Sequence, residues 1–172
     1  TQNLLAACAR AAVGHVVALS VVGSERVPDS GYFRAKIAQE ALIKAGPVPF
    51  TLVRATQFFE FLMSVAHVGT VGNTVPLPSA PLQPIAAADV AAALADVALQ
   101  APLNGTCEVA GPEAVPLDAL VRRVLQARQD PREVVLDENA LYFGTRIDER
   151  SLVPGPGARI GQTTLDRWLA EA

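Results

Sequence analysis

Two residues near the start of one segment could do chemistry together. Tyr32 and Lys36 are four positions apart, so in a helix they project from the same face. A phenol has a pKa of about 10, and a nearby ammonium favours the phenolate and lowers that pKa toward neutrality. Such a tyrosine can give a proton to a carbonyl oxygen while hydride reaches the carbonyl carbon, and the lysine can also hydrogen-bond the hydroxyls of a ribose. The pair therefore suggests reduction of a carbonyl or a similar group.

A third candidate is Ser20, which ends an apolar run and precedes Tyr32 by 12 residues. Its hydroxyl could hold the same carbonyl oxygen. The alternative is a helix that carries both side chains without a catalytic role, because random placement of two tyrosines and two lysines gives this spacing in roughly one chain in forty. The sequence around the pair decides how much weight it receives.

The surrounding segments predict the fold that would position these side chains. Residues 15–23, 49–55 and 105–111 are short runs, apolar on both faces, as is typical of buried parallel strands. Helical patterns occupy residues 1–14, 30–45, 57–68, 89–100, 117–129 and 162–172. Strands that alternate with helices in this way predict an α/β fold with a parallel sheet.

The composition argues against several classes of partner. The net charge is −3, with 14 basic and 17 acidic residues, and no run of lysine or arginine occurs, so we expect neither nucleic acid nor a membrane as a partner. The apolar stretch at residues 4–23 has no basic region before it and is interrupted by Arg10 and His15, unlike a signal peptide. Cys8 and Cys107 are too few and too far apart for a disulfide framework or a metal site, which favours a cytoplasmic protein.

Four blocks of the sequence, in this order, resemble the NmrA-like, atypical short-chain dehydrogenase/reductases. They are HVVALSVVG, GYFRAKIAQEALIKAG, PFTLVRATQFFEFL and LQPIAAADVAAALADVAL, and the tail PGPGARIGQTTLDRWLAE is similar to the closing segment of these proteins. The resemblance covers almost the whole chain. It implies a Rossmann-like fold, NAD or NADP as cofactor without a preference between them, and a small-molecule substrate.

The resemblance also assigns roles to residues. It implies that Ser20, Tyr32 and Lys36 are the catalytic serine, tyrosine and lysine, with Lys36 also in contact with the cofactor. It implies that four residues after the second strand lie along the nicotinamide end of the cofactor: Ala55, Thr56, Gln57 and Phe58. Many members of this family lack the tyrosine, so the presence of both Tyr32 and Lys36 favours an active reductase over a silent sensor.

The glycine-rich phosphate loop with which such proteins begin has no counterpart here. Gly155, Gly157 and Gly161 are glycine-spaced, but no buried strand precedes them, and a surface loop that leads into a helix is the better interpretation. We therefore expect the C-terminal portion of such a protein, with the parallel sheet present from about its fifth strand onward.

This interpretation predicts the domain organisation. Residues 1–172 would form a single domain, in which residues 1–66 are the second half of a Rossmann core. Residues 67–172 would be a substrate lobe with a returning strand and helices. The sheet edge at residues 15–20 would be bare. Three explanations remain open: a longer chain, a truncated gene, or a partner, such as a second copy in a homo-oligomer, that covers the edge.

Three functions follow. The first is an NAD(P)H-dependent oxidoreductase that reduces a small carbonyl, quinone or similar substrate by hydride transfer. The second is a non-catalytic redox sensor or regulatory module that binds NAD(P) without turnover. The third is a fragment without activity of its own. Turnover with a quinone would separate the first from the second.

Overall fold

The computed structural model describes residues 1–171, and its centre is a parallel four-stranded sheet. The strands are β1 (Val16–Val21), β2 (Phe50–Ala55), β5 (Gly105–Ala110) and β8 (Arg159–Ile160), in the order β1-β2-β5-β8. The first three are the predicted apolar runs, so the α/β fold with a partial Rossmann-like sheet is confirmed. β8 was not predicted, because it is two residues long and lies within the glycine-spaced stretch interpreted as a loop.

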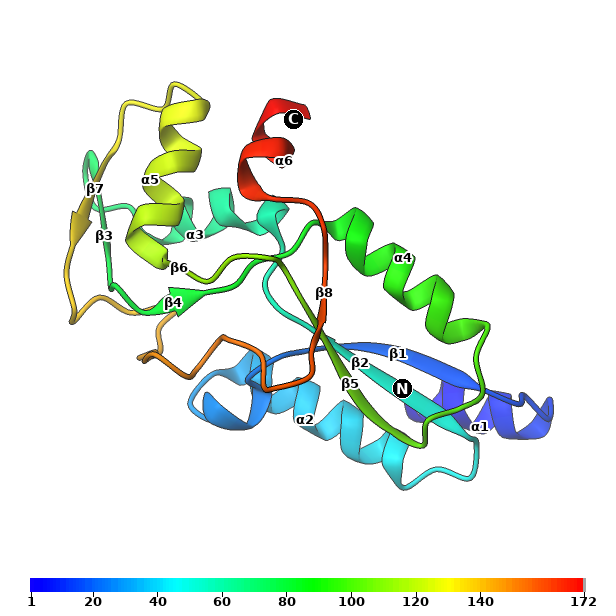
Figure 1. Ribbon diagram of the computed structural model, residues 1–172. Coiled ribbons are helices and arrows are strands. Elements are labelled where there is room, and N and C mark those ends of the chain that lie inside the picture. Colours follow the sequence, from blue (N-terminus) through cyan, green and yellow to red (C-terminus); the bar gives the residue numbers. More distant parts are fainter. Residues whose placement is uncertain (172) are drawn as a thin grey trace.

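Helices cover both faces of this sheet (Figure 1). Helix α2 (Gly31–Lys44) packs on one face and α4 (Ala87–Ala98) on the other. Helix α1 (Gln2–Arg10) has no buried residue and lies beside α2, where Gln39 Nε2 donates to Thr1 Oγ1 at 3.3 Å. Between β1 and α2, a short 3₁₀ turn, Ser24–Arg26, leads the chain to the start of the helix. The predicted Tyr32 and Lys36 thus lie at the first turns of α2, beside the carboxyl end of β1.

One edge of β1 has no partner strand among residues 1–171, as the sequence suggested. The carbonyl oxygen of Leu19 on this strand accepts a hydrogen bond from Lys36 Nζ at 2.8 Å. The side chain of Leu19 is partly exposed. The edge is therefore bound at one point by a side chain of α2.

A smaller lobe lies beside the sheet, at the left of Figure 1. It contains α3 (Leu62–Gly69), which follows a 3₁₀ turn at Phe59–Phe61, α5 (Leu117–Ala127) and α6 (Leu165–Glu171). Two strand pairs complete it: β3 (Thr74–Leu77) is parallel to β7 (Glu133–Leu136), and β4 (Pro81–Leu82) is antiparallel to β6 (Val115–Pro116). The chain returns from this region to the main sheet twice, at β5 and at β8, so the predicted division near residue 67 stays a prediction.

The apolar face of α5 holds the lobe together. Its residues Leu120, Val121, Val124 and Leu125 are buried, as their helical spacing predicted. They belong to the same core cluster as Val21 of β1. This cluster therefore joins the lobe to the carboxyl end of the sheet.

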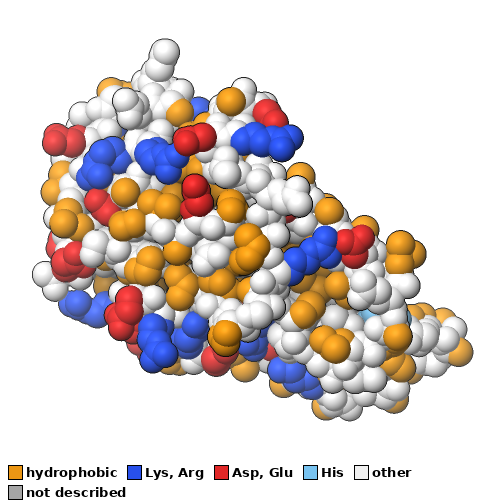
Figure 2. All heavy atoms as spheres, in the orientation of Figure 1, with side chains coloured by type: hydrophobic (Ala, Val, Ile, Leu, Met, Phe, Trp, Pro, Cys, Tyr) orange, Lys and Arg blue, Asp and Glu red, His pale blue; other side chains and the backbone are white. Residues whose placement is uncertain are grey.

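The surface carries both signs of charge. On the face shown in Figure 2, acidic and basic side chains are mixed over the lobe, which agrees with the small net charge of −3. None of the helices within residues 1–171 is long and apolar enough to cross a membrane.

Candidate functional site

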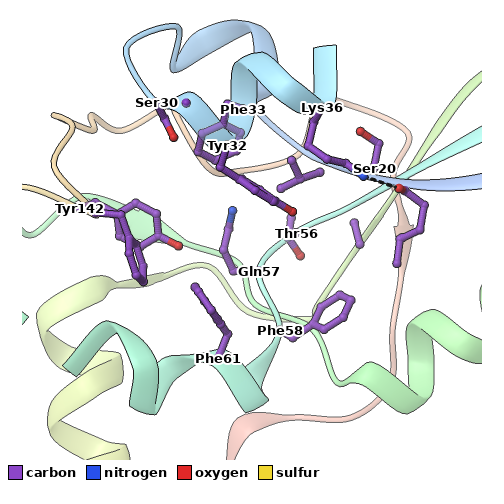
Figure 3. Close-up of a pocket in the computed structure, with 15 residues that line it drawn as sticks. Ser20, Ser30, Tyr32, Phe33, Lys36, Thr56, Gln57, Phe58, Phe61 and Tyr142 are labelled. Carbon is purple, nitrogen blue, oxygen red and sulfur yellow. Dashed lines mark hydrogen bonds between the residues drawn. The ribbon is translucent and has the colours of Figure 1, made fainter. Parts of the chain in front are cut away.

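A cavity of about 640 Å³ lies where the carboxyl ends of β1 and β2 meet the start of α2 and the lobe. The carboxyl ends of parallel strands are where open α/β sheets bind ligands. Figure 3 shows that side chains from all these elements converge on this space. The cavity is lined by Leu19, Ser20, Val21, Ser30, Gly31, Tyr32, Phe33, Lys36, Ala55, Thr56, Gln57, Phe58, Phe61, Tyr142 and Phe143. All seven residues singled out from the sequence are among them.

Tyr32 reaches into this cavity from the first turn of α2 and is 62% exposed. Its ring packs edge-on against Phe33, with ring centroids 5.5 Å apart. Partial burial raises the pKa of Tyr32 above its ordinary value of 10.0. The phenol is therefore protonated at neutral pH and can donate a hydrogen bond to a ligand oxygen.

The expected lowering of the Tyr32 pKa by Lys36 is not found in the structure. The ammonium of Lys36 donates to Leu19 O at 2.8 Å (dashed in Figure 3) and to Gln39 Oε1 at 2.7 Å. Burial lowers the pKa of Lys36, and the negative charge of Glu40 opposes that change. Lys36 thus lines the cavity while its charge is held on the edge of β1 and on its own helix.

The hydroxyl of Ser20 is also not free to donate to a ligand oxygen, contrary to what the sequence had suggested. Its hydroxyl donates to Glu40 Oε1 at 2.6 Å, so its hydrogen is directed at a carboxylate of α2. In this arrangement Ser20 can offer only its lone pairs to a ligand. The sequence did not signal this contact, because Glu40 has the helical spacing of an ordinary surface residue.

Glu40, whose side chain is buried, is the centre of an ionic cluster that adjoins the cavity at Ser20. Arg54 of β2 donates to it twice, from Nε to Oε1 and from Nη2 to Oε2, both at 2.8 Å. Lys44 Nζ lies 3.3 Å from Oε2, and Glu25 accepts from Arg54 Nη1 at 3.0 Å. Burial alone would raise the pKa of Glu40, but the hydrogen bonds from Arg54 and Ser20 and the charge of Arg54 lower it to about 2. Every polar group of this cluster is partnered.

Residues 55–58, which are the last residue of β2 and the three after it, form one wall of the cavity, and their backbone is held by residues 83–85. Thr56 Oγ1 donates to Gln83 O at 2.6 Å, and Ile85 N donates to Gln57 O at 2.9 Å. These bonds fix the path of the chain from Ala55 to Phe58. The Gln57 amide points into the cavity (Figure 3), and its Oε1 has no hydrogen-bond partner among residues 1–171.

The cavity also has aromatic residues that come from distant parts of the chain. The rings of Phe61 and Phe143 stack with centroids 5.2 Å apart, and Tyr142 meets Phe143 edge-on at 4.9 Å. Phe61 belongs to a run of aromatic residues at 58–61. Nothing in the local sequence connects Tyr142 to a site more than 80 residues earlier.

The glycine-spaced stretch does not form a phosphate-binding loop. Gly161 N donates to Ala110 O at 2.8 Å, directly after β8. A Cβ on Gly161 would lie only 2.6 Å from Asp89 Oδ2, so this glycine permits close packing of the segment against α4. Asp89 in turn accepts from Thr163 N at 2.9 Å. Among the residues described, no group of three or more His, Cys, Asp or Glu side chains could hold a metal ion.

Known structures share this fold. No protein-family model and no curated protein sequence matches the chain. An NADPH-dependent quinone oxidoreductase (QOR2) from Escherichia coli superposes with a TM-score of 0.71 and 18% identity, over 99% of this chain and 71% of that one. The same enzyme complexed with NADPH gives a TM-score of 0.62 and 22% identity, over 79% of this chain and 48% of that one. MoeE5, solved with UDP-glucuronic acid and NAD, superposes with a TM-score of 0.70 and 18% identity, over 98% of this chain and 67% of that one.

At these identities the likeness is one of fold. It confirms the predicted fold: this partial Rossmann-like architecture superposes on part of the quinone oxidoreductase and on part of a nucleoside-diphosphate-sugar epimerase from Staphylococcus aureus. It leaves the roles of Ser20, Tyr32 and Lys36 as predictions.

Proposed function

We propose that this chain carries the substrate side of an NAD(P)H-dependent reductase for a small carbonyl, quinone or similar compound. The observation that carries the proposal is the convergence of Tyr32, Lys36 and the segment 55–58 on one cavity at the carboxyl end of a parallel sheet. The fold supports it, because structures with the same architecture are described as complexes with NADPH or NAD.

Tyr32 would be the acid. Its phenol is protonated at neutral pH and is directed into the cavity, so it can donate to a carbonyl oxygen. Bound NAD(P)H would supply the hydride to the carbonyl carbon. The oxygen then takes the Tyr32 proton, which gives an alcohol, and solvent returns a proton to the phenolate.

Lys36 and the end of β2 would position the reacting partners. Residues 55–58 are the wall against which a nicotinamide ring would lie, and their backbone is fixed by the bonds to residues 83–85. Lys36 would contact a ribose hydroxyl by exchanging its bond to Gln39 Oε1, which belongs to a side chain of the same helix, whereas Leu19 O belongs to the backbone of β1. Its bond to Leu19 O would hold it at the cavity.

The experiment is to follow NADPH and NADH oxidation with a panel of carbonyl compounds and quinones, for the wild type and Tyr32→Phe. A general acid typically contributes a factor of about 10²–10⁴, so we expect Tyr32→Phe to lose at least about 100-fold. Ile37→Ala is the matched control, since Ile37 lies on the same helix and does not line the cavity. An unchanged rate in Tyr32→Phe would remove the tyrosine from the mechanism.

A binding module without turnover is the second candidate, and one observation favours it. Ser20 and Lys36 are satisfied by Glu40, Leu19 and Gln39, and the pKa of Tyr32 is raised by burial and not lowered. A sensor needs only to bind the cofactor. Stabilisation of the fold by NADPH or NADH together with no oxidation in the presence of any acceptor would support this candidate.

A further inference from the structure

The turn at residues 142–145 has an unusual backbone. Tyr142 N donates to Thr145 O at 2.8 Å, and Thr145 N donates to Tyr142 O at 3.1 Å, so the two residues close a tight turn. Its central residues have positive φ, 48° at Phe143 and 79° at Gly144. Asn-Gly is the preferred sequence for such a turn, and a bulky aromatic residue at its first central position is strained. Backbone strain of this kind persists where a side chain is needed in a particular place.

The turn places a flat apolar surface on the cavity. The ring of Phe143 stacks on Phe61 with an interplanar angle of 23°. Both rings line the cavity and remain partly exposed, at 37% and 42%. An aromatic ligand ring could extend this stack, because offset ring stacking is favourable at centroid separations of about 4.5–7 Å.

The same turn brings a hydroxyl to the cavity. Tyr142 is only 5% exposed, and its hydroxyl, which points into the cavity (Figure 3), makes no hydrogen bond to any of residues 1–171. Buried tyrosines usually find a partner for this group. Burial raises the pKa of Tyr142, so its phenol is protonated at neutral pH and can donate a hydrogen bond.

Gln57 provides a second group of this kind. It is 8% exposed, its amide nitrogen points between Tyr32 and Tyr142 in the view of Figure 3, and this nitrogen hydrogen-bonds none of the described residues. Polar groups of buried residues are normally paired within the protein. The Gln57 nitrogen and the Tyr142 hydroxyl come from separate segments and are directed into one cavity, so a single ligand there can hydrogen-bond both.

We propose that Tyr142 and Gln57 form a second polar anchor, so that the cavity selects a flat aromatic ring that carries a polar substituent away from its reacting carbonyl. The ring would lie against Phe143, and the substituent would hydrogen-bond the Tyr142 hydroxyl and the Gln57 amide. Only the placement of the carbonyl at Tyr32 rests on the proposed function. A wholly apolar ligand would leave both anchor groups unpaired.

The test compares two probes that differ by one hydroxyl, 4-hydroxyacetophenone and acetophenone. Their dissociation constants are measured by ligand-observed NMR on the wild-type chain, Tyr142→Phe and Gln57→Leu, without cofactor. We expect the wild type to prefer the hydroxylated probe about tenfold, and each variant to reduce that preference to about threefold or less, as expected for the loss of one neutral hydrogen bond. Tyr142→Phe keeps the ring, and thermal unfolding verifies that both variants are folded.

The variant Phe143→Asn tests the role of the aromatic ring independently of the two polar groups. It creates the Asn-Gly sequence that this turn prefers, so relief of strain offsets the lost ring stack and the melting temperature should stay within about 3 °C of the wild type. Both probes should bind at least about fivefold more weakly. Weaker binding without loss of stability is a result that a merely structural role for Phe143 would not give.

The outcomes separate this inference from the proposed function. Equal affinity for the two probes, a preference unchanged in Tyr142→Phe, or no binding of either probe would overturn the anchor, with water then the partner of both groups. Retained preference in the wild type together with no NADPH oxidation would overturn the reductase and leave the anchor standing. NADPH oxidation by the wild type without any preference for the hydroxylated probe would overturn the anchor and leave the reductase standing.

Discussion

Two sets of polar side chains lie at the same end of the sheet and differ in how they are hydrogen-bonded. In the cluster of Ser20, Glu40 and Arg54, each side chain hydrogen-bonds another member, and the Glu40 side chain is only 3% exposed. In the cavity, the Gln57 amide nitrogen and the Tyr142 hydroxyl belong to buried residues, point into the open space and hydrogen-bond none of residues 1–171. Buried polar groups are normally paired within the protein. The difference indicates that the first cluster holds the fold and that the second is completed by a ligand.

The largest effect is expected from breaking the paired cluster. Arg54→Leu would leave Glu40 charged and buried without its principal partner, and it should lower the free energy of unfolding by about 3–5 kcal/mol. Urea unfolding measures this loss. The matched control is Arg159→Leu, which removes an exposed arginine paired with Asp96 and should cost at most about 1 kcal/mol. Equal losses in the two variants would contradict the structural role of the cluster.

A second way to break the cluster is acid. The folded pKa of Glu40, about 2, lies below its ordinary value of 4.5, so the stabilisation is present above pH 4.5 and is lost as the pH falls toward 2. That difference corresponds to about 3 kcal/mol. Unfolding measured from pH 6 to pH 2 should show a steeper loss for the wild type than for Glu40→Gln, which has no carboxylate to titrate. Parallel curves would mean that Glu40 is not held as a charge by Arg54.

The sequence predicts the strands and the helix that carry the paired cluster, but it does not predict the buried Glu40 at its centre. The strands β1, β2 and β5 could be predicted because they are short, largely apolar runs, and Tyr32 and Lys36 because a helix places residues four apart on one face. Glu40 could not be recognised as buried, since its polarity and spacing are those of a surface residue. Its burial depends on Arg54, which lies on β2 and donates to the Glu40 carboxylate of α2.

The residues that line the cavity were harder to predict from the sequence. Residues 55–58 were identified through the family resemblance, and the structure shows why they lie together: they are the last residue of β2 and the three after it, at the carboxyl end of the sheet. Tyr142 and Phe143 reach the cavity through a turn whose backbone at Phe143 is one that phenylalanine disfavours, so local preference argues against it. The short strands β6 and β8 were also missed, because strands of two residues leave no periodicity to detect.

If the Gln57 amide serves a ligand and not the structural framework, its removal should not destabilise the fold. The free energy of unfolding of Gln57→Leu without ligand tests this most directly. The substitution removes a buried oxygen that has no partner within residues 1–171 and leaves an apolar side chain in an aromatic pocket. We expect the stability in urea to be unchanged or higher by up to about 1 kcal/mol. A loss of more than about 1 kcal/mol would mean that the Gln57 amide is part of the structural framework, like Glu40, and would contradict the distinction between the two groups.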